Sequence, residues 1–225
     1  MTLPGGPLAL VGGAEWTEGC DFDVELLAAS GTDEVVVLPT AAAYELPDQV
    51  VERARSWFAG LGARVAAVSA LDRAGAHDEA NVEAVRRARF VYLSGGSAMH
   101  LLSVLKRTPL WDAVLAARAD GAVVAAAGPS ASVLCDAMVD PRGGGFGVGL
   151  GLVDELTLIP RYEQWSAEKS RRTIELAPKG LVLAGLPART ALVFDGTARW
   201  RVAGTGEVRL FRDGQAVELA SLGST

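Results

Sequence analysis

The chain is poor in the side chains on which many catalytic and metal sites depend. Its 225 residues include two histidines and two cysteines, and Cys20 and Cys135 stand far apart in different motifs. That spacing fits neither a metal site nor a redox pair, so we expect two reduced, buried thiols, no metal and no cofactor. Because histidine is the usual general base near neutral pH, His77 and His100 are the candidates for that role.

Positive charge is also scarce, since 21 lysines and arginines stand against 27 acids and give a formal net charge of −6. No basic stripe is available to neutralise phosphates, which argues against a nucleic-acid-binding protein. No apolar run reaches the roughly 18 residues of a membrane span, and the N-terminal stretch lacks the basic segment of a signal peptide. We therefore expect a cytoplasmic protein that binds neither nucleic acid nor membranes.

Half of the residues are apolar, and they form short runs that alternate with amphipathic helical patterns. The predicted strands are Pro7–Val11, Glu34–Pro39, Ala63–Ser69, Phe90–Ser94 and Ala122–Ala126. The predicted helices are Cys20–Ala29, Pro47–Leu61, Asp78–Ala88, Ala98–Leu105 and Leu110–Ala119. Strands that are apolar throughout and alternate with helices predict a parallel sheet covered on both faces. The fold class is α/β: a single three-layer domain over residues 1–225 with a mainly parallel, doubly wound sheet.

The C-terminal third continues this pattern and then changes it. The predicted segments are a strand over Leu152–Ile159, a helix over Ser166–Leu176, and strands over Leu181–Gly185 and Thr190–Phe194. The alternating runs Ala198–Val202 and Glu207–Arg212, followed by Asp213-Gly214, predict antiparallel edge strands with a hairpin turn.

Ligands of open α/β sheets bind beyond the carboxyl ends of the parallel strands. Five loops are expected to meet there: Gly12–Glu15, Pro39–Ala41, Gly95–Ser97, the turn at Gly128, and Pro160–Tyr162.

The stretch from Val123 to Gly144 reads as an apolar strand, a tight turn and the start of a helix, which is the layout of a nucleophile elbow. It resembles the dipeptidase E and cyanophycinase family of serine peptidases. Further blocks follow the family in the same order: Leu10–Glu15, Cys20–Asp23, Asp33–Glu45, Phe90–Ser97, His100–Lys106, Pro109–Ala113, Met138–Gly144, Arg171–Pro178 and Thr190–Leu192. The resemblance implies a class I glutamine amidotransferase-like fold and an ancestral serine hydrolase of small peptides.

The resemblance also locates the positions where the family carries its nucleophile and its base. Without a gap, the nucleophile position falls on Gly128, which has no side chain to attack with. The alternative is a strand two residues longer, which would bring Ser130 to the apex. The histidine of the family corresponds to Arg161, and a guanidinium stays protonated and cannot accept a proton. His77 is expected at the surface, and His100 is expected to order its loop.

Other parts of the family's catalytic site are partly retained in this sequence. Asp140 stands in the Val139–Arg142 block either as the orienting acid or as a turn-forming residue, and we favour the turn. The Gly95-Gly96 loop resembles the family's oxyanion loop, in which backbone N–H groups face the developing charge. Pro129 follows Gly128 directly and has no N–H to donate.

These substitutions predict a catalytically inactive homologue that binds a small peptide or an anionic ligand, or that pairs with a second copy or an active relative. The predicted binding residues are Gly95, Gly96, Ser97, Gly128, Arg161 and Tyr162. Arg161 either binds the anion or pairs with Glu163. An active serine-type peptide hydrolase that uses Ser130 is the alternative function. A glutamine amidotransferase would need a cysteine at the elbow, whereas Cys135 lies about two helical turns beyond it.

Overall fold

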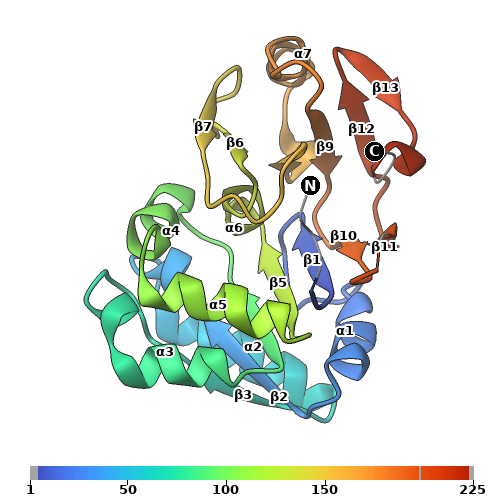
Figure 1. Cartoon of the computed structure of the whole chain (residues 1–225). Coiled ribbons are helices and arrows are strands. Elements are labelled where there is room, and N and C mark those ends of the chain that lie inside the picture. Colours follow the sequence, from blue (N-terminus) through green and yellow to red (C-terminus); the bar gives the residue numbers. More distant parts are fainter. Residues whose placement is uncertain (1–4, 198, 223–225) are drawn as a thin grey trace.

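A computed structural model describes residues 5–197 and 199–222. Its main sheet has seven strands in the order β11-β10-β1-β5-β4-β2-β3 (Figure 1). These strands are β1 (Leu8–Val11), β2 (Glu34–Leu38), β3 (Arg64–Ala67), β4 (Phe90–Leu93), β5 (Val123–Ala127), β10 (Thr190–Phe194) and β11 (Trp200–Gly204). Strands β1 to β5 run parallel, and β10 and β11 add an antiparallel edge. The predicted α/β class with a mainly parallel sheet is confirmed.

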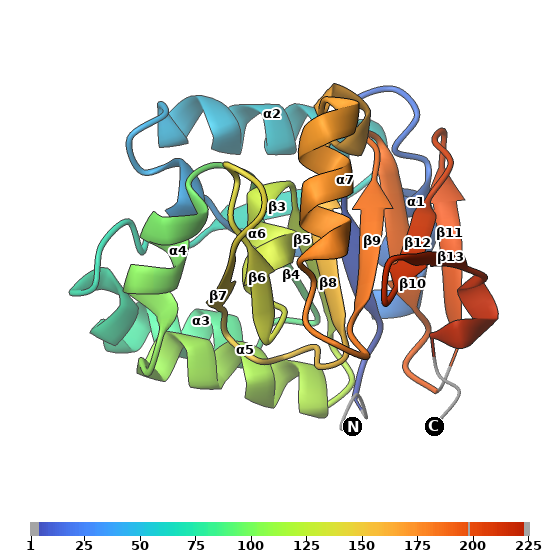
Figure 2. The same ribbon diagram turned by 90° about the horizontal axis from the view of Figure 1, so that it is seen from above.

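Helices cover both faces of this sheet, as Figure 2 shows for α2 on one side and α3 and α5 on the other. The bounds are α1 (Phe22–Ser30), α2 (Pro47–Gly60), α3 (Glu79–Arg86), α4 (Ala98–Leu105) and α5 (Pro109–Ala119). One apolar cluster joins α1 and α2 to the sheet, and a second joins α3, α4 and α5 to its other face. The three predicted layers follow from this arrangement. Within the two described ranges, no helix is long and apolar enough to cross a lipid bilayer.

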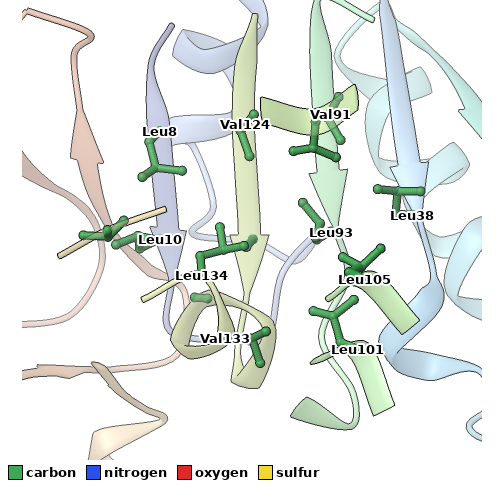
Figure 3. Close-up of a cluster of buried hydrophobic side chains, with 14 of the residues drawn as sticks. Leu8, Leu10, Leu38, Val91, Leu93, Leu101, Leu105, Val124, Val133 and Leu134 are labelled. Atoms are coloured by element: carbon green, nitrogen blue, oxygen red, sulfur yellow. The ribbon is translucent and has the colours of Figure 1, made fainter. Parts of the chain in front are cut away.

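The larger apolar cluster combines side chains from one face of the main sheet with side chains from helices such as α4 (Figure 3). Along each strand, successive side chains alternate between the two faces. Leu8, Leu10 and Val124 belong to this face of β1 and β5, whereas Ala9 and Ala125 belong to the opposite face. All five side chains are fully buried. A parallel strand covered on both faces has no solvent side, which explains why these strands read as continuous apolar runs rather than as alternating ones.

The helix starts follow local sequence signals. Ser97, Thr108 and Ser166 cap α4, α5 and α7 (Ala167–Glu175) with their side-chain oxygens, and Pro47 and Pro109 stand at the first positions of α2 and α5. Such residues satisfy or avoid the unpaired N–H groups of a first helical turn. The predicted helix bounds agree with the structure to within two residues.

The chain beyond β5 builds a second sheet of four strands in the order β13-β12-β9-β8. These strands are β8 (Leu156–Pro160), β9 (Val182–Leu186), β12 (Arg209–Arg212) and β13 (Gln215–Val217). Asp213-Gly214 forms the predicted hairpin turn, which joins β12 to β13. The run predicted from Ala198 becomes the edge strand β11, although Ala198 itself lies outside the described residues. The run predicted from Glu207 instead becomes β12, which pairs with β9 in the second sheet.

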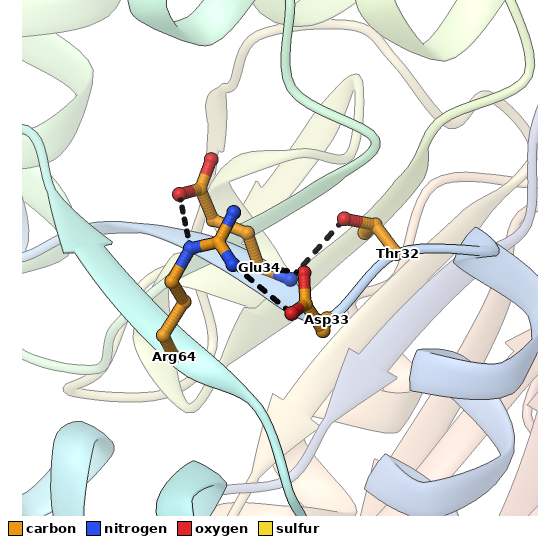
Figure 4. A network of polar contacts seen from close by, with 4 residues as sticks. All are labelled: Thr32, Asp33, Glu34 and Arg64. Carbon is orange, nitrogen blue, oxygen red and sulfur yellow. Dashed lines mark hydrogen bonds and ion pairs between the residues drawn. The ribbon is translucent and has the colours of Figure 1, made fainter.

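Between the two sheets the chain forms the short helix α6 (Pro129–Val133) and an antiparallel pair, β6 (Ala137–Val139) and β7 (Phe146–Val148). No local pattern predicts this pair, because a glycine-rich run lies at β7. At the far edge of the main sheet, Arg64 of β3 binds Asp33 at 3.0 Å and Glu34 at 3.0 Å (Figure 4). These exposed ion pairs contribute little to stability.

Candidate functional site

The turn between β5 and α6 has Gly128 at its apex. Its φ of 55° and ψ of −131° form a conformation that favours glycine, and its N–H donates to the carbonyl of Val11 at 2.8 Å. A Cβ built on Gly128 would lie 3.9 Å from the Cα of Gly13 and 4.0 Å from the Cα of Gly95. The site therefore has room for a side chain at the apex, where the sequence provides none.

Arg161 follows β8, and its side chain lies against Gly13 in the loop between β1 and α1. Its N–H donates to the carbonyl of Gly12 at 2.9 Å, and a Cβ built on Gly13 would lie 2.9 Å from its Nε. In residues 5–197 and 199–222 its guanidinium has no hydrogen bond or ion pair. The pairing with Glu163, which the sequence left open, does not form in the described residues; that carboxylate instead accepts from the N–H of Ala188 at 3.1 Å.

A cavity of about 310 Å³ opens beside these two residues. Residues of α6, the β4–α4 loop, the β8–α7 segment and two further loops line it. They are Glu45, Gly96, Ala98, Pro129, Ser132, Val139, Pro141, Pro160, Arg161, Gln164 and Trp165. Its volume is in the range of small-molecule sites, and it carries both a cation, Arg161, and an anion, Glu45.

The two glycines of the predicted oxyanion loop differ in their hydrogen bonds. The N–H of Gly95 donates to Oε1 of Glu15 at 2.8 Å. In the described part of the chain the N–H of Gly96 has no partner, and this residue lines the cavity. The backbone donor that remains available to a ligand is therefore Gly96 rather than Gly95.

Ser97 and the histidines have structural contacts. Ser97 caps α4 by accepting from the N–H of His100 at 3.3 Å. The imidazole of His100 contacts the carbonyl of Leu71 at 2.8 Å and lies edge-on to the ring of Tyr44. His77 is exposed in a short turn (Gly75–His77). His100 thus orders its loop, as expected.

The serines of α6 point to two different places. Ser130 is fully buried, and its hydroxyl donates to the carbonyl of Ser94 at 2.6 Å. Strand β5 ends at Ala127, so the longer strand that would bring Ser130 to the apex is not formed. Ser132 lines the cavity, and its hydroxyl donates to the carbonyl of Leu158 at 3.4 Å. Cys135 is fully buried beyond the helix, and burial raises the pKa of its thiol.

Asp140 holds a turn. Its carboxylate accepts from the backbone N–H of Arg142 at 2.8 Å and binds the guanidinium of the same residue at 2.7 Å. These bonds lower the pKa of Asp140 to about 2. Val139 and Pro141 line the cavity on either side of Asp140, which itself does not.

Tyr162 faces away from this cavity. Its ring covers Gly185 of β9, where a Cβ would lie 2.6 Å from the ring, and it packs near Phe211 of β12. It lines a separate open groove between α7 and the second sheet. Of the six predicted binding residues, Gly96 and Arg161 line the cavity, and Gly95 and Gly128 adjoin it in the chain. Ser97 caps α4 instead, and Tyr162 lies elsewhere.

Several residues that the structure brings to the site were not among the predicted site residues. Glu15 and Glu45 end two of the blocks that resemble the peptidase family, and this position was the available signal. Trp165 matches the W-S that follows the histidine position in the family, and Ser132 stands in the elbow, but neither match indicates that the side chain lines a cavity. Gln164 carries no such signal, because its part in the cavity depends on how the β8–α7 segment packs. In the described ranges no group of three histidine, cysteine, aspartate or glutamate side chains is placed to hold a metal ion.

A comparison with models of known protein families shows to which family the chain belongs. The model of peptidase family S51 matches residues 8–199. The chain belongs to peptidase family S51. Comparison with curated protein sequences gives no match.

Two solved structures share the fold of this S51 chain. A peptidase from an acI-B1 actinobacterium superimposes with a TM-score of 0.85 at 24% identity, over 95% of this chain and 93% of that one. A protein from Listeria monocytogenes EGD-e, proposed to be a peptidase E, gives a TM-score of 0.70 at 17% identity, over 90% and 100% of the two chains. At these identities the likeness establishes the shared fold.

Proposed function

We propose that this S51-family chain binds a short peptide, or another small carboxylate, without cleaving it. The observation that carries the proposal is that Gly128 leaves the elbow apex without a side chain, while the side chain of Arg161 lies against Gly13, the neighbour of that apex. A serine peptidase needs a hydroxyl at the apex and a base that accepts its proton. Gly128 supplies no hydroxyl, and Arg161 is a permanent cation.

The same residues suit carboxylate recognition. Among the residues that the structure describes, the guanidinium of Arg161 has no partner, and it offers paired donors to a carboxylate. The N–H of Gly96 adds a neutral donor in the same cavity. Glu45, which also lines the cavity, is suited to the ammonium group of an unblocked peptide.

Calorimetric titration with dialanine and dialaninamide tests this proposal, because the two peptides differ in the terminal carboxylate. We expect dialanine to bind at least about tenfold more tightly, as one charge-assisted pair provides, and to be recovered intact by mass spectrometry. Arg161→Ala should remove this preference. Arg171→Ala is the matched control, since this exposed arginine pairs with Glu175 on α7. Equal affinities for the two peptides, or a preference that survives Arg161→Ala, would overturn the proposal.

A further inference from the structure

Glu15 makes a long-range contact with the loop between β4 and α4 (Gly95–Ser97). The N–H of Gly95 donates to its Oε1 at 2.8 Å, across 80 residues of sequence. A Cβ built on Gly95 would lie 3.0 Å from the same oxygen. A glycine at this position therefore lets the carboxylate approach the backbone closely.

The backbone around Glu15 is held in an unfavourable conformation. Ala14 and Trp16, on either side of it, have φ values of 52° and 60°, in the left-handed region that residues with a Cβ seldom adopt. Such conformations persist where the surrounding structure fixes them, and they cluster at functional sites. Here the hydroxyl of Thr17 donates to the carbonyl of Ala14 at 2.6 Å, and the indole of Trp16 is buried against Tyr92.

The loop that Glu15 binds is fixed at two points. At Gly95 the partner is the carboxylate, and at Ser97 the backbone N–H donates to the carbonyl of Ala41 at 2.8 Å. Gly96 lies between these points with a φ of 144°, and a side chain there would overlap the backbone of Ala41. The N–H of Gly96, which has no partner in the described part of the chain, is thus held in a defined place beside the cavity.

We propose that Glu15 is a positioning residue for ligand binding, whose carboxylate binds Gly95 so that the N–H of Gly96 stays available to a bound carboxylate. This inference rests on the proposed function. Glu15 itself does not line the cavity. Its role is therefore to supply a hydrogen-bond acceptor, and its negative charge is unfavourable for an anionic ligand near the same loop.

Because the carboxylate of Glu15 is both a hydrogen-bond acceptor and a negative charge, two substitutions of Glu15 should affect the affinity for dialanine differently. Glu15→Gln keeps a carbonyl oxygen for Gly95 and removes the charge, so dialanine should bind as well as to the wild-type protein or a few-fold more tightly. Glu15→Ala removes the acceptor, so dialanine should bind roughly tenfold more weakly. Glu18→Ala, an exposed acid in the same loop, is the matched control and should leave the affinity unchanged.

Hydrogen exchange of the Gly95 amide, read by NMR without ligand, provides the second measurement. We expect its protection to fall roughly tenfold or more in Glu15→Ala and to be retained in Glu15→Gln. Unchanged protection in Glu15→Ala, or lost protection with unchanged dialanine affinity, would refute the positioning role. If the wild-type protein bound neither peptide, the proposed function and the ligand role of Glu15 would both fail, whereas the exchange data would still decide whether Glu15 fixes Gly95.

Discussion

The substitution Asp23→Asn should change how the stability of the protein depends on pH. Asp23 is fully buried at the start of α1, and its Oδ2 accepts from the indole N–H of Trp57 at 2.9 Å. Its Oδ1 has no hydrogen-bond partner among the described residues. Burial raises the pKa of Asp23 to about 8, and the charge of Glu15 adds to the rise. The folded protein therefore holds a proton on this carboxyl at pH 7, where the unfolded chain has lost it.

The magnitude follows from this difference in proton binding. The ordinary pKa of the carboxyl is 3.8. Between pH 4 and pH 8 the folded state binds one proton more than the unfolded state, so the free energy of unfolding falls by about 1.4 kcal/mol per pH unit. The contribution of Asp23 to the free energy of unfolding is fully present below about pH 4. Roughly 4 kcal/mol of this contribution is lost between pH 5 and pH 8.

Urea unfolding followed by circular dichroism at pH 5, 6, 7 and 8 measures this slope. Asn has the shape of the protonated carboxyl and can still accept from Trp57, so Asp23→Asn should resemble the wild-type protein at pH 5 and become more stable relative to it as the pH rises. Asp21→Asn is the control, because this exposed acid lies two residues away and makes no side-chain cap. Parallel pH curves for Asp23→Asn and the wild-type protein would refute the reasoning.

Two further predictions concern the elbow. Gly128→Ser should reduce the free energy of unfolding by roughly 1–2 kcal/mol in urea titrations, because φ is positive at the apex, and the variant should not react with a fluorophosphonate probe. Adding Arg161→His should make the double variant reactive; labelling of Gly128→Ser alone would show that another base serves the site. Ser130→Ala should reduce the free energy of unfolding by about 1–3 kcal/mol, since the carbonyl of Ser94 loses a buried donor. An unchanged free energy of unfolding in Ser130→Ala would contradict a structural role for that hydroxyl.

Much of the fold could be predicted because its strands and helices carry local signals. Leu8–Val11 reads as a buried strand, and Ser97 and Thr108 mark helix starts through capping preferences that operate within three residues. Four of the five expected loops follow parallel strands of the main sheet, so their meeting at one edge follows from the topology. The fifth, Pro160–Tyr162, follows β8 of the second sheet and joins them through the bond from the Arg161 N–H to the carbonyl of Gly12.

The parts that could not be predicted depend on partners distant in sequence. The pairing of β12 with β9 moves it out of the main sheet, and no local pattern distinguishes one sheet from the other. The bond between Glu15 and Gly95 spans 80 residues. The orientation of Tyr162 is set by Gly185, where the absence of a side chain on β9 leaves space for its ring.

The account of the site is tested most directly by incubating the wild-type protein with a library of unblocked dipeptides and following them by mass spectrometry. With Gly128 at the apex and Arg161 in place of a base, we predict that every dipeptide stays intact and that the protein retains dipeptides through their free carboxylates. Cleavage of any dipeptide that Ser130→Ala abolishes would contradict this account and identify the chain as an active peptidase.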